Sequence, residues 1–150
     1  MKQILLTTIL LLISFIDLKA QSYEYKVITS VESIVPMGIG RSRIISSEED
    51  KDYNNFTSER TAENKKQNKS KRSSIKINNF EETKLLNFFS IAGINFKNIA
   101  SNDAIISSKI NTMTSNGWDL AFVVSGVESD AGKDDGQGIY ITRYIFKRLR

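Results

Sequence analysis

Apolar and polar positions alternate over three long stretches of the chain, which is the pattern of β-strands with one buried face. The first stretch covers residues 23–31, where one face carries tyrosine, valine and threonine and the other carries Glu24, Lys26, Ile28 and Ser30. The other two cover residues 118–125 and 139–148 and flank a loop that contains four glycines. Strands on either side of such a loop predict an antiparallel hairpin. The last strand is partly apolar on both faces, so we expect it to be central, and a fourth strand is expected near Arg43.

A helix is expected at residues 80–91, where apolar side chains recur at helical spacing. Asn79 and Glu82 have the spacing of a capping box, in which each side chain binds a backbone N–H of the first turn. The apolar positions are Leu85, Leu86, Phe88, Phe89 and Ala92.

A second helix is expected to begin near Asn102 or Asp103 and to end at Gly117. Its apolar positions are Ile106, Ile110 and Met113. With Gly117 in the left-handed conformation, Trp118 would contact Met113 in a Schellman motif. We therefore expect Gly117 and Trp118 to be structural residues, with the indole ring in the core rather than in a binding site.

Residues 46–74 are polar, and we expect them to form a flexible insert within one domain that covers residues 21–150. The predicted fold class is α+β: a single antiparallel sheet of three to four strands with two helices packed on it, plus this long polar insert. The insert carries most of a basic cluster, with one acid, Glu63, among its residues. The cluster consists of Arg60, Lys65, Lys66, Lys69, Lys71, Arg72 and Lys76.

Residues 1–20 have the features of a secretory signal peptide. Lys2 precedes a continuous apolar run at residues 4–16, and Ala20 offers a small residue before a cleavage site. The alternative is a membrane anchor, but the run of 13 residues that ends before Asp17 is shorter than the roughly 20 that span a bilayer. We expect a secreted or periplasmic bacterial protein with no stable membrane span after cleavage.

Three segments together resemble a family of short bacterial domains of unknown function. In that family a Tyr-x-Tyr-Lys-Val strand, a helix that ends in Gly-Trp-Glu-Leu and a final aromatic strand that ends in Lys-Arg form one small α+β sheet. The matching segments are residues 23–27, 117–124 and 144–148, with Asp119 in place of the usual glutamate. The resemblance covers about a third of the chain and leaves residues 34–100 as a large insertion. It implies a fold and no activity.

The composition removes several kinds of chemistry, because the chain has no histidine and no cysteine. Ser-His and Cys-His couples are excluded, as are disulfides and the nitrogen and sulfur ligands of most zinc sites. A paired-carboxylate hydrolase that uses Asp119 and Glu128 is one remaining alternative. We expect no enzymatic activity and no cofactor.

Three binding alternatives remain. The basic cluster is a candidate site for polyanions such as lipopolysaccharide phosphates or extracellular nucleic acid, because clustered cations release counterions on contact. The glycine-rich segment 38–43 lacks the spacing of a phosphate loop, so a turn or edge strand is favoured there. An irregular calcium site would use Glu128, Asp130, Asp134 and Asp135.

The sequence therefore predicts a non-catalytic envelope or secreted protein that acts as an interaction module through its sheet edge or second face. Polyanion binding through the insert is the alternative. The expected partner is another envelope protein or an anionic polymer, and a homodimer stays open.

Overall fold

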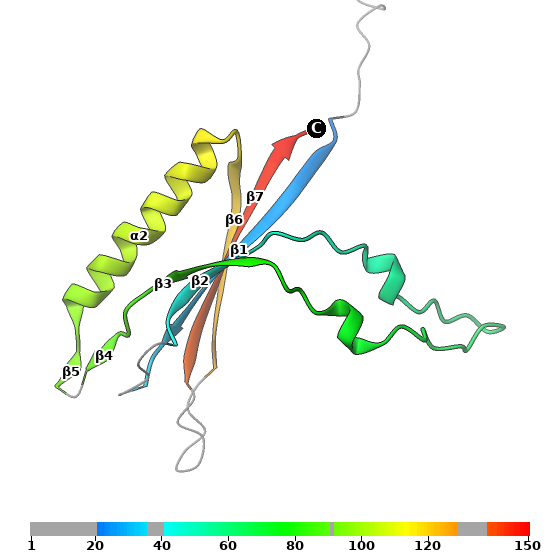
Figure 1. The fold of residues 1–150 in the computed structure, drawn as a ribbon, viewed down its shortest axis with the longest axis horizontal. Helices are drawn as coiled ribbons and strands as arrows, with labels where there is room; N and C mark the ends of the chain where they lie inside the picture. Colours follow the sequence, from blue (N-terminus) through cyan, green and yellow to red (C-terminus); the bar gives the residue numbers. More distant parts are fainter. Residues whose placement is uncertain (1–20, 36–40, 91, 129–137) are drawn as a thin grey trace, which may run out of the picture.

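The computed structural model describes residues 21–35, 41–90, 92–128 and 138–150 (Figure 1). The predicted signal peptide, the glycines of segment 38–43 and most of the glycine-rich loop lie outside the described residues. Within those residues, no helix is both long and apolar enough to cross a membrane.

The main element is a five-stranded antiparallel sheet with the strand order β3-β2-β1-β7-β6. Its central pair joins the two longest strands, β1 and β7, over eleven residue pairs from Tyr23↔Leu149 to Ser33↔Ile139. Strand β7 also pairs with β6, so the last strand is interior, as its apolar faces predict. The strands are β1 (Tyr23–Ser33), β2 (Arg43–Ser47), β3 (Phe80–Lys84), β6 (Asp119–Glu128) and β7 (Ile139–Leu149).

The predicted fold class is wrong in the number of strands and helices. The structure has five strands in the main sheet rather than three to four, and a second sheet of two short strands, β4 (Phe89–Ser90) and β5 (Gly93–Ile94). The described residues hold one α-helix, α2 (Phe96–Ser115), and two 3₁₀ turns, η1 (Tyr53–Phe56) and η2 (Arg72–Ile75). The polypeptide is therefore mostly sheet.

The helix predicted at residues 80–91 does not form, because its first half extends the sheet. All five residues of β3 pair with β2, from Ser47↔Phe80 to Arg43↔Lys84. The Leu85 N–H continues this pairing by donating to Ser42 O at 2.9 Å, and the Leu85 side chain is buried. Leu86 stays 47% exposed, so the apolar spacing marks no continuous helical face.

Helix α2 begins seven residues before the predicted start. Asn95 is the N-cap, and its side chain accepts a hydrogen bond from the Asn98 N–H. Asn102, predicted as a cap, lies inside the helix and is 1% exposed. Asn102 therefore makes tertiary contacts from within the helix and does not cap it.

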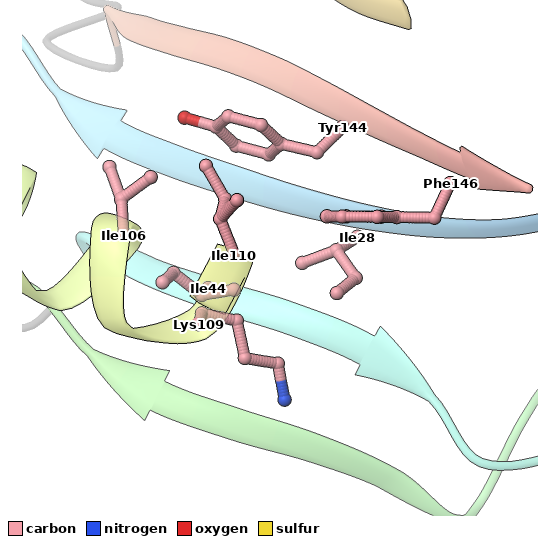
Figure 2. A pocket seen from close by; sticks show the side chains of 7 residues that line it. All are labelled: Ile28, Ile44, Ile106, Lys109, Ile110, Tyr144 and Phe146. Carbon is pink, nitrogen blue, oxygen red and sulfur yellow. The ribbon is translucent and has the colours of Figure 1, made fainter. Parts of the chain in front are cut away.

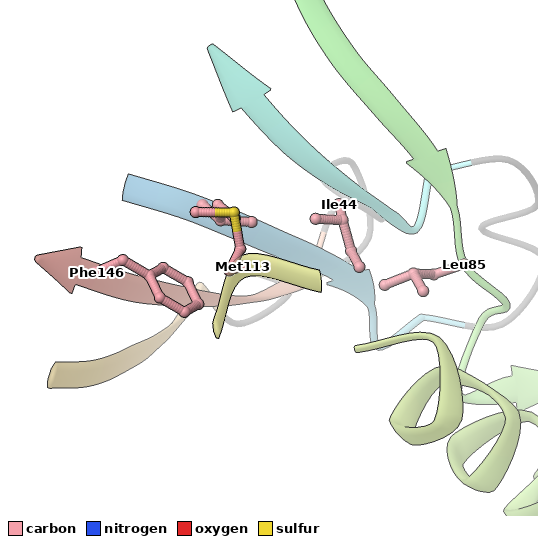
Figure 3. Close-up of a cluster of buried hydrophobic side chains, with 5 residues drawn as sticks. Ile44, Leu85, Met113 and Phe146 are labelled. Atoms are coloured by element: carbon pink, nitrogen blue, oxygen red, sulfur yellow. The ribbon is translucent and has the colours of Figure 1, made fainter. Parts of the chain in front are cut away.

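The helix packs against one face of the sheet through a small apolar core. The buried members come from β1, β2, β7, the segment after β3, and α2, as Figure 3 shows. Ile106, Ile110, Trp118 and Tyr144 pack around them. A crevice of about 10 Å³ remains between α2 and the sheet (Figure 2), room for about one water molecule. The core residues are Ile28, Ile44, Leu85, Met113 and Phe146.

Residues 48–79 connect β2 to β3 and form an arm that extends away from the sheet, on the opposite side from α2 (Figure 1). The arm includes η1 and η2, whereas Ser46 and Ser47, assigned to the predicted insert, belong to β2. Its two halves are joined by Asn68, whose side-chain amide donates hydrogen bonds to the carbonyls of Asn55 and Thr57. The predicted flexibility of this segment stays a prediction.

Candidate interaction surface

Strand β6 forms one edge of the main sheet, and no other described element pairs with its outer side. Its eight central residues, 120–127, carry no charge. Five large apolar side chains on this strand are between 38% and 63% exposed. They are Leu120, Phe122, Val123, Val124 and Val127. A long apolar edge of this kind offers unpaired backbone groups to another chain.

The opposite edge of the sheet has the features that prevent such pairing. Strand β3 is five residues long, and three of them are charged. Glu82 forms an ion pair with Arg43 at 2.9 Å, and Glu81 forms one with Lys109 of α2 at 2.6 Å. Short strands and edge charges are the usual protection against edge-to-edge association. The two edges therefore differ in length and in charge, two features that decide whether a further strand can add.

The sheet face that α2 does not cover continues the apolar surface inward from β6. The pairing register places Phe122 beside Ile145 and Ile145 beside Val27, so these three side chains form one row across three strands. Phe122 is 63% exposed and Val27 is 45% exposed. A second apolar row contains Gly126, Ile141 and Val31, and the row between the two contains Val124, the exposed Arg143 and Thr29. We call this surface, with the β6 edge, the open face.

The helix-to-strand corner before β6 has the geometry of a Schellman motif. Gly117 has a φ of 80°, its N–H donates to Thr114 O, and the Trp118 N–H donates to Met113 O at 3.1 Å. The Trp118 ring packs against the core cluster but is only half-buried. The Arg148 guanidinium lies 4.5 Å from its centroid and bonds Glu24 at 2.6 Å. The indole is thus a structural contact at the rim of the core, covered by an arginine.

A cleft of about 380 Å³ lies where the arm leaves the sheet. Strand β2 pairs with β1 only as far as Ile28, so the first five residues of β1 lack a paired strand on that side among the described residues. The cleft walls include Tyr25, Trp118 and the carboxylates of Glu48 and Glu49. Hydrogen bonds from the backbone of Asn79 and Asn78 hold the pKa of Glu49 below its usual value. Those hydrogen bonds join the two ends of the arm, and they engage one oxygen of the Glu49 carboxylate.

A buried polar cluster joins α2 to the sheet. The Asn102 amide donates to Glu32 Oε1 at 2.9 Å and to Leu86 O at 2.7 Å, and its oxygen accepts from the Leu86 N–H at 2.8 Å. Burial raises the pKa of Glu32, and the nearby Asp103 carboxylate raises it further. Burial likewise raises the pKa of Tyr144. Glu32 and Asn102 are buried and line none of the crevices found among the described residues, so we assign the cluster a structural role.

The seven basic residues of the predicted polyanion site lie on the arm, and all are exposed. Within the described residues none of them forms an ion pair with a carboxylate. Hydrogen bonds join the two limbs of the arm about a turn at residues 61–64, which places Arg60 before the turn. The other six basic residues follow on the returning limb. The structure thus collects the cluster on one projection from the sheet.

The remaining candidate sites do not assemble. Asp119 and Glu128 lie at opposite ends of β6, about 30 Å apart at 3.4 Å per residue, too far for paired-carboxylate hydrolysis. Arg43 of the glycine-rich segment belongs to β2, and Ser42 Oγ accepts from the Ser33 N–H. Of the calcium candidates only Glu128 is described, and Asp130, Asp134 and Asp135 lie outside. No group of acids among the described residues is arranged to hold a metal ion.

No family model, curated protein or solved structure matches the chain. The resemblance to a family of short bacterial domains therefore stays a prediction.

Sequence reasoning missed the exposure of β6. The alternation at residues 118–125 predicts a strand with one buried face. The structure instead places β6 at the sheet edge, with both faces largely open. One signal for this exposure is present in the sequence. Residues 118–125 carry apolar side chains on both faces, and they pair with a strand, 139–148, that is itself expected to be central.

Proposed function

We propose that this protein is a non-catalytic binding module that docks another polypeptide strand along the β6 edge. The observation that carries the proposal is the ten-residue edge strand with an uncharged centre and exposed valine and phenylalanine side chains. In strand addition, backbone hydrogen bonds supply affinity and alternate side chains supply specificity. Val123 and Val127 would contact the partner on one face, and Phe122 and Val124 on the other.

Binding is favoured over catalysis by the side chains that the chain contains. Without histidine or cysteine, catalysis would depend on carboxylate, lysine, serine or tyrosine groups in close contact. The buried Glu32 is engaged by Asn102, and the carboxylates of β6 are at opposite ends of the strand. The open face, in contrast, presents apolar area that only a partner would remove from water.

The proposal is tested by a photo-cross-linking residue at position 124 in the cells that make the protein. Phe80 of the β3 edge is the matched control, because it is 49% exposed against 57% for Val124. We expect a discrete protein adduct, identified by mass spectrometry, from position 124 and none from position 80. Equal adducts at both positions, or none at position 124, would contradict strand docking on β6.

We also propose that binding takes place outside the cytoplasm, since residues 1–20 have the composition of a signal peptide. Amino-terminal sequencing of the protein recovered from the periplasm or medium should begin at Gln21. A chain that begins at Met1 and stays in the cytoplasm would exclude this part of the proposal.

Polyanion binding through the arm is the second candidate function, supported by seven exposed basic side chains without a carboxylate partner in the described structure. Changing Lys69, Lys71 and Arg72 together to glutamine should lower the salt concentration at which the protein leaves a heparin column. The control changes Lys84, Lys97 and Arg143, three exposed bases outside the arm, to glutamine. Equal retention of the two triple variants would show that only net charge matters.

A further inference from the structure

We infer that the strand docked on β6 is the β6 strand of a second copy of this chain, paired antiparallel about a two-fold axis beside Val124. The inference rests on the proposed function of the β6 edge and names its partner. The pairing would join two five-stranded sheets into one sheet of ten strands, with both copies of α2 on the same face. Three properties of β6 support this partner and this register.

The first property is the distribution of charge along β6. Its only charged residues are Asp119 and Glu128, one at each end. An antiparallel pair with two-fold symmetry requires one residue to face its own copy, so the axis lies beside a residue rather than between two. With Val124 at the axis, the uncharged residues 120–127 of the two copies lie side by side, and charges occur only at the two ends of the pair, where the bulge between Leu120 and Phe122 places Asp119 on the same face as Glu128 of the copy. Repulsion between these end carboxylates lowers the affinity of the pair and leaves its uncharged centre unaffected.

The second property is a complementary shape on the open face. With Val124 at the axis, Phe122 lies opposite Gly126 of the copy. A Cβ atom placed on Gly126 would meet no atom within 4 Å, so there is open space above this glycine. The 63% exposed Phe122 ring fits that space. An aromatic side chain that covers a glycine on the neighbouring strand is a known means of stabilising such a pair.

The third property is the continuity of the apolar rows. In one copy, Phe122 continues the row of Val27 and Ile145, and in the other Gly126 continues the row of Val31 and Ile141. The proposed register joins these two rows end to end through the phenylalanine ring. The dimer would therefore bury Phe122, the one aromatic side chain of β6, against apolar neighbours of the copy.

The expected affinity is modest, because one pair of edge strands buries less area than a standard interface. Stable protein interfaces bury roughly 1,200–2,000 Å² in total. A single edge pairing lies below or at the lower end of this range, so we expect a weak dimer. The dimer should therefore appear within a concentration series rather than at all concentrations.

Sedimentation velocity over about 1 to 500 µM tests the self-association. We expect the wild-type chain, without residues 1–20, to shift from monomer to dimer. Val124→Lys places two like charges at the axis and should raise the midpoint concentration at least about tenfold. Phe80→Lys, on the β3 edge, is the matched control and should leave the midpoint unchanged.

Single cysteines test the register without a change of charge, because the chain has no cysteine of its own. Facing residues in an antiparallel pair have Cα atoms about 4.5–5.5 Å apart, within the range of disulfide geometry. Val124→Cys should therefore form a disulfide-linked dimer under mild oxidation. Val127→Cys, on the same strand and 61% exposed, should not, since its own copy would lie about 20 Å away at 3.4 Å per residue.

A chain that stays monomeric throughout the series, with Val124→Cys uncross-linked, would overturn the inference, as would cross-linking at Val127 in preference to Val124. The cellular photo-cross-link separates this failure from failure of the proposed function. An adduct of twice the chain mass at position 124 supports the second copy. An adduct with a different protein contradicts it but retains strand docking on β6, and no adduct contradicts both.

Discussion

At the scale of single residues, the fold depends on polar side chains that bind backbone groups far away in the sequence. Asn102 is the main example, because its amide holds the backbone of Leu86 by two hydrogen bonds and also donates to Glu32. It thus connects α2, the segment after β3 and β1. Such a contact fixes the helix position more specifically than the few apolar side chains of α2 do.

Asn102→Ala should lower the free energy of unfolding by about 2–4 kcal/mol, because it leaves buried groups of Leu86 and Glu32 without their partner. Asn111→Ala, at an exposed position of the same helix, should change it by less than about 0.5 kcal/mol. Urea denaturation of the two variants provides the comparison. Equal stability of both would show that the amide contacts contribute little.

Gly117→Ala should cost about 1–2 kcal/mol, because a residue with a Cβ is strained in the left-handed conformation. The added Cβ would meet Arg148 Cδ at 3.7 Å, an ordinary contact, so crowding adds nothing. Gly126→Ala, whose Cβ would meet open space, is the control and should cost less when measured on dilute protein. Thermal unfolding of both variants measures the difference. A Gly117→Ala variant as stable as the wild type would show that the left-handed conformation imposes no strain.

The raised pKa of Glu32 predicts a loss of stability as pH rises. The unfolded chain releases this proton near the ordinary value of 4.5, while the folded chain retains it to higher pH. The free energy of unfolding therefore falls across that window, and the loss persists above the folded pKa. Glu32→Gln, which still offers Asn102 an acceptor oxygen, should be more stable than wild type at about pH 7 and equal to it at about pH 3. Urea denaturation at both pH values checks this, and lower stability at neutral pH would contradict it.

At the scale of elements, the sequence predicted the strands better than the helices. Period-two alternation identified β1, β6 and β7 as strands, although both faces of β6 are largely open. This pattern could not distinguish an interior strand from an exposed edge strand, because apolar residues such as Phe122 and Val124 occur in both. Exposure depends on which strand is last in the order β3-β2-β1-β7-β6, and that order depends on contacts distant in sequence.

The error at residues 80–91 has a related cause. Local spacing and the Asn79–Glu82 pattern favoured a helix, and intrinsic propensities differ by only a few tenths of a kcal/mol per residue. Strand β2 supplies a complete set of backbone partners for Phe80–Lys84, and this tertiary pairing decides the outcome. Of the candidate sites, the basic cluster was visible as composition, whereas the β6 surface required the strand order.

At the scale of the whole molecule, the arm is an addition to the sheet rather than part of its core. Its residues contribute nothing to the buried apolar cluster, and most of its hydrogen bonds in the described structure join arm residues to one another. Its base is joined to β1 by one ion pair, Lys26 to Glu48 at 3.5 Å.

Replacing residues 51–77 by a short turn should therefore keep β2 paired with β3. We expect a change in the free energy of unfolding within about 1 kcal/mol, since exposed ion pairs contribute little, together with loss of heparin retention. Thermal unfolding and column elution measure the two effects. A variant that fails to fold would show that the arm is part of the cooperative unit, and unchanged retention would remove the polyanion function.

The most direct measurement of the central claim is amide hydrogen exchange of β6 at low and high protein concentration. In the free chain, the N–H groups on the outer side of this edge strand face solvent and should exchange quickly. Strand pairing would protect them, so exchange across Asp119–Glu128 should slow as concentration rises through the dimer midpoint, while exchange in Phe80–Lys84 stays constant. Exchange in β6 that does not depend on concentration would contradict pairing of this edge with a second copy.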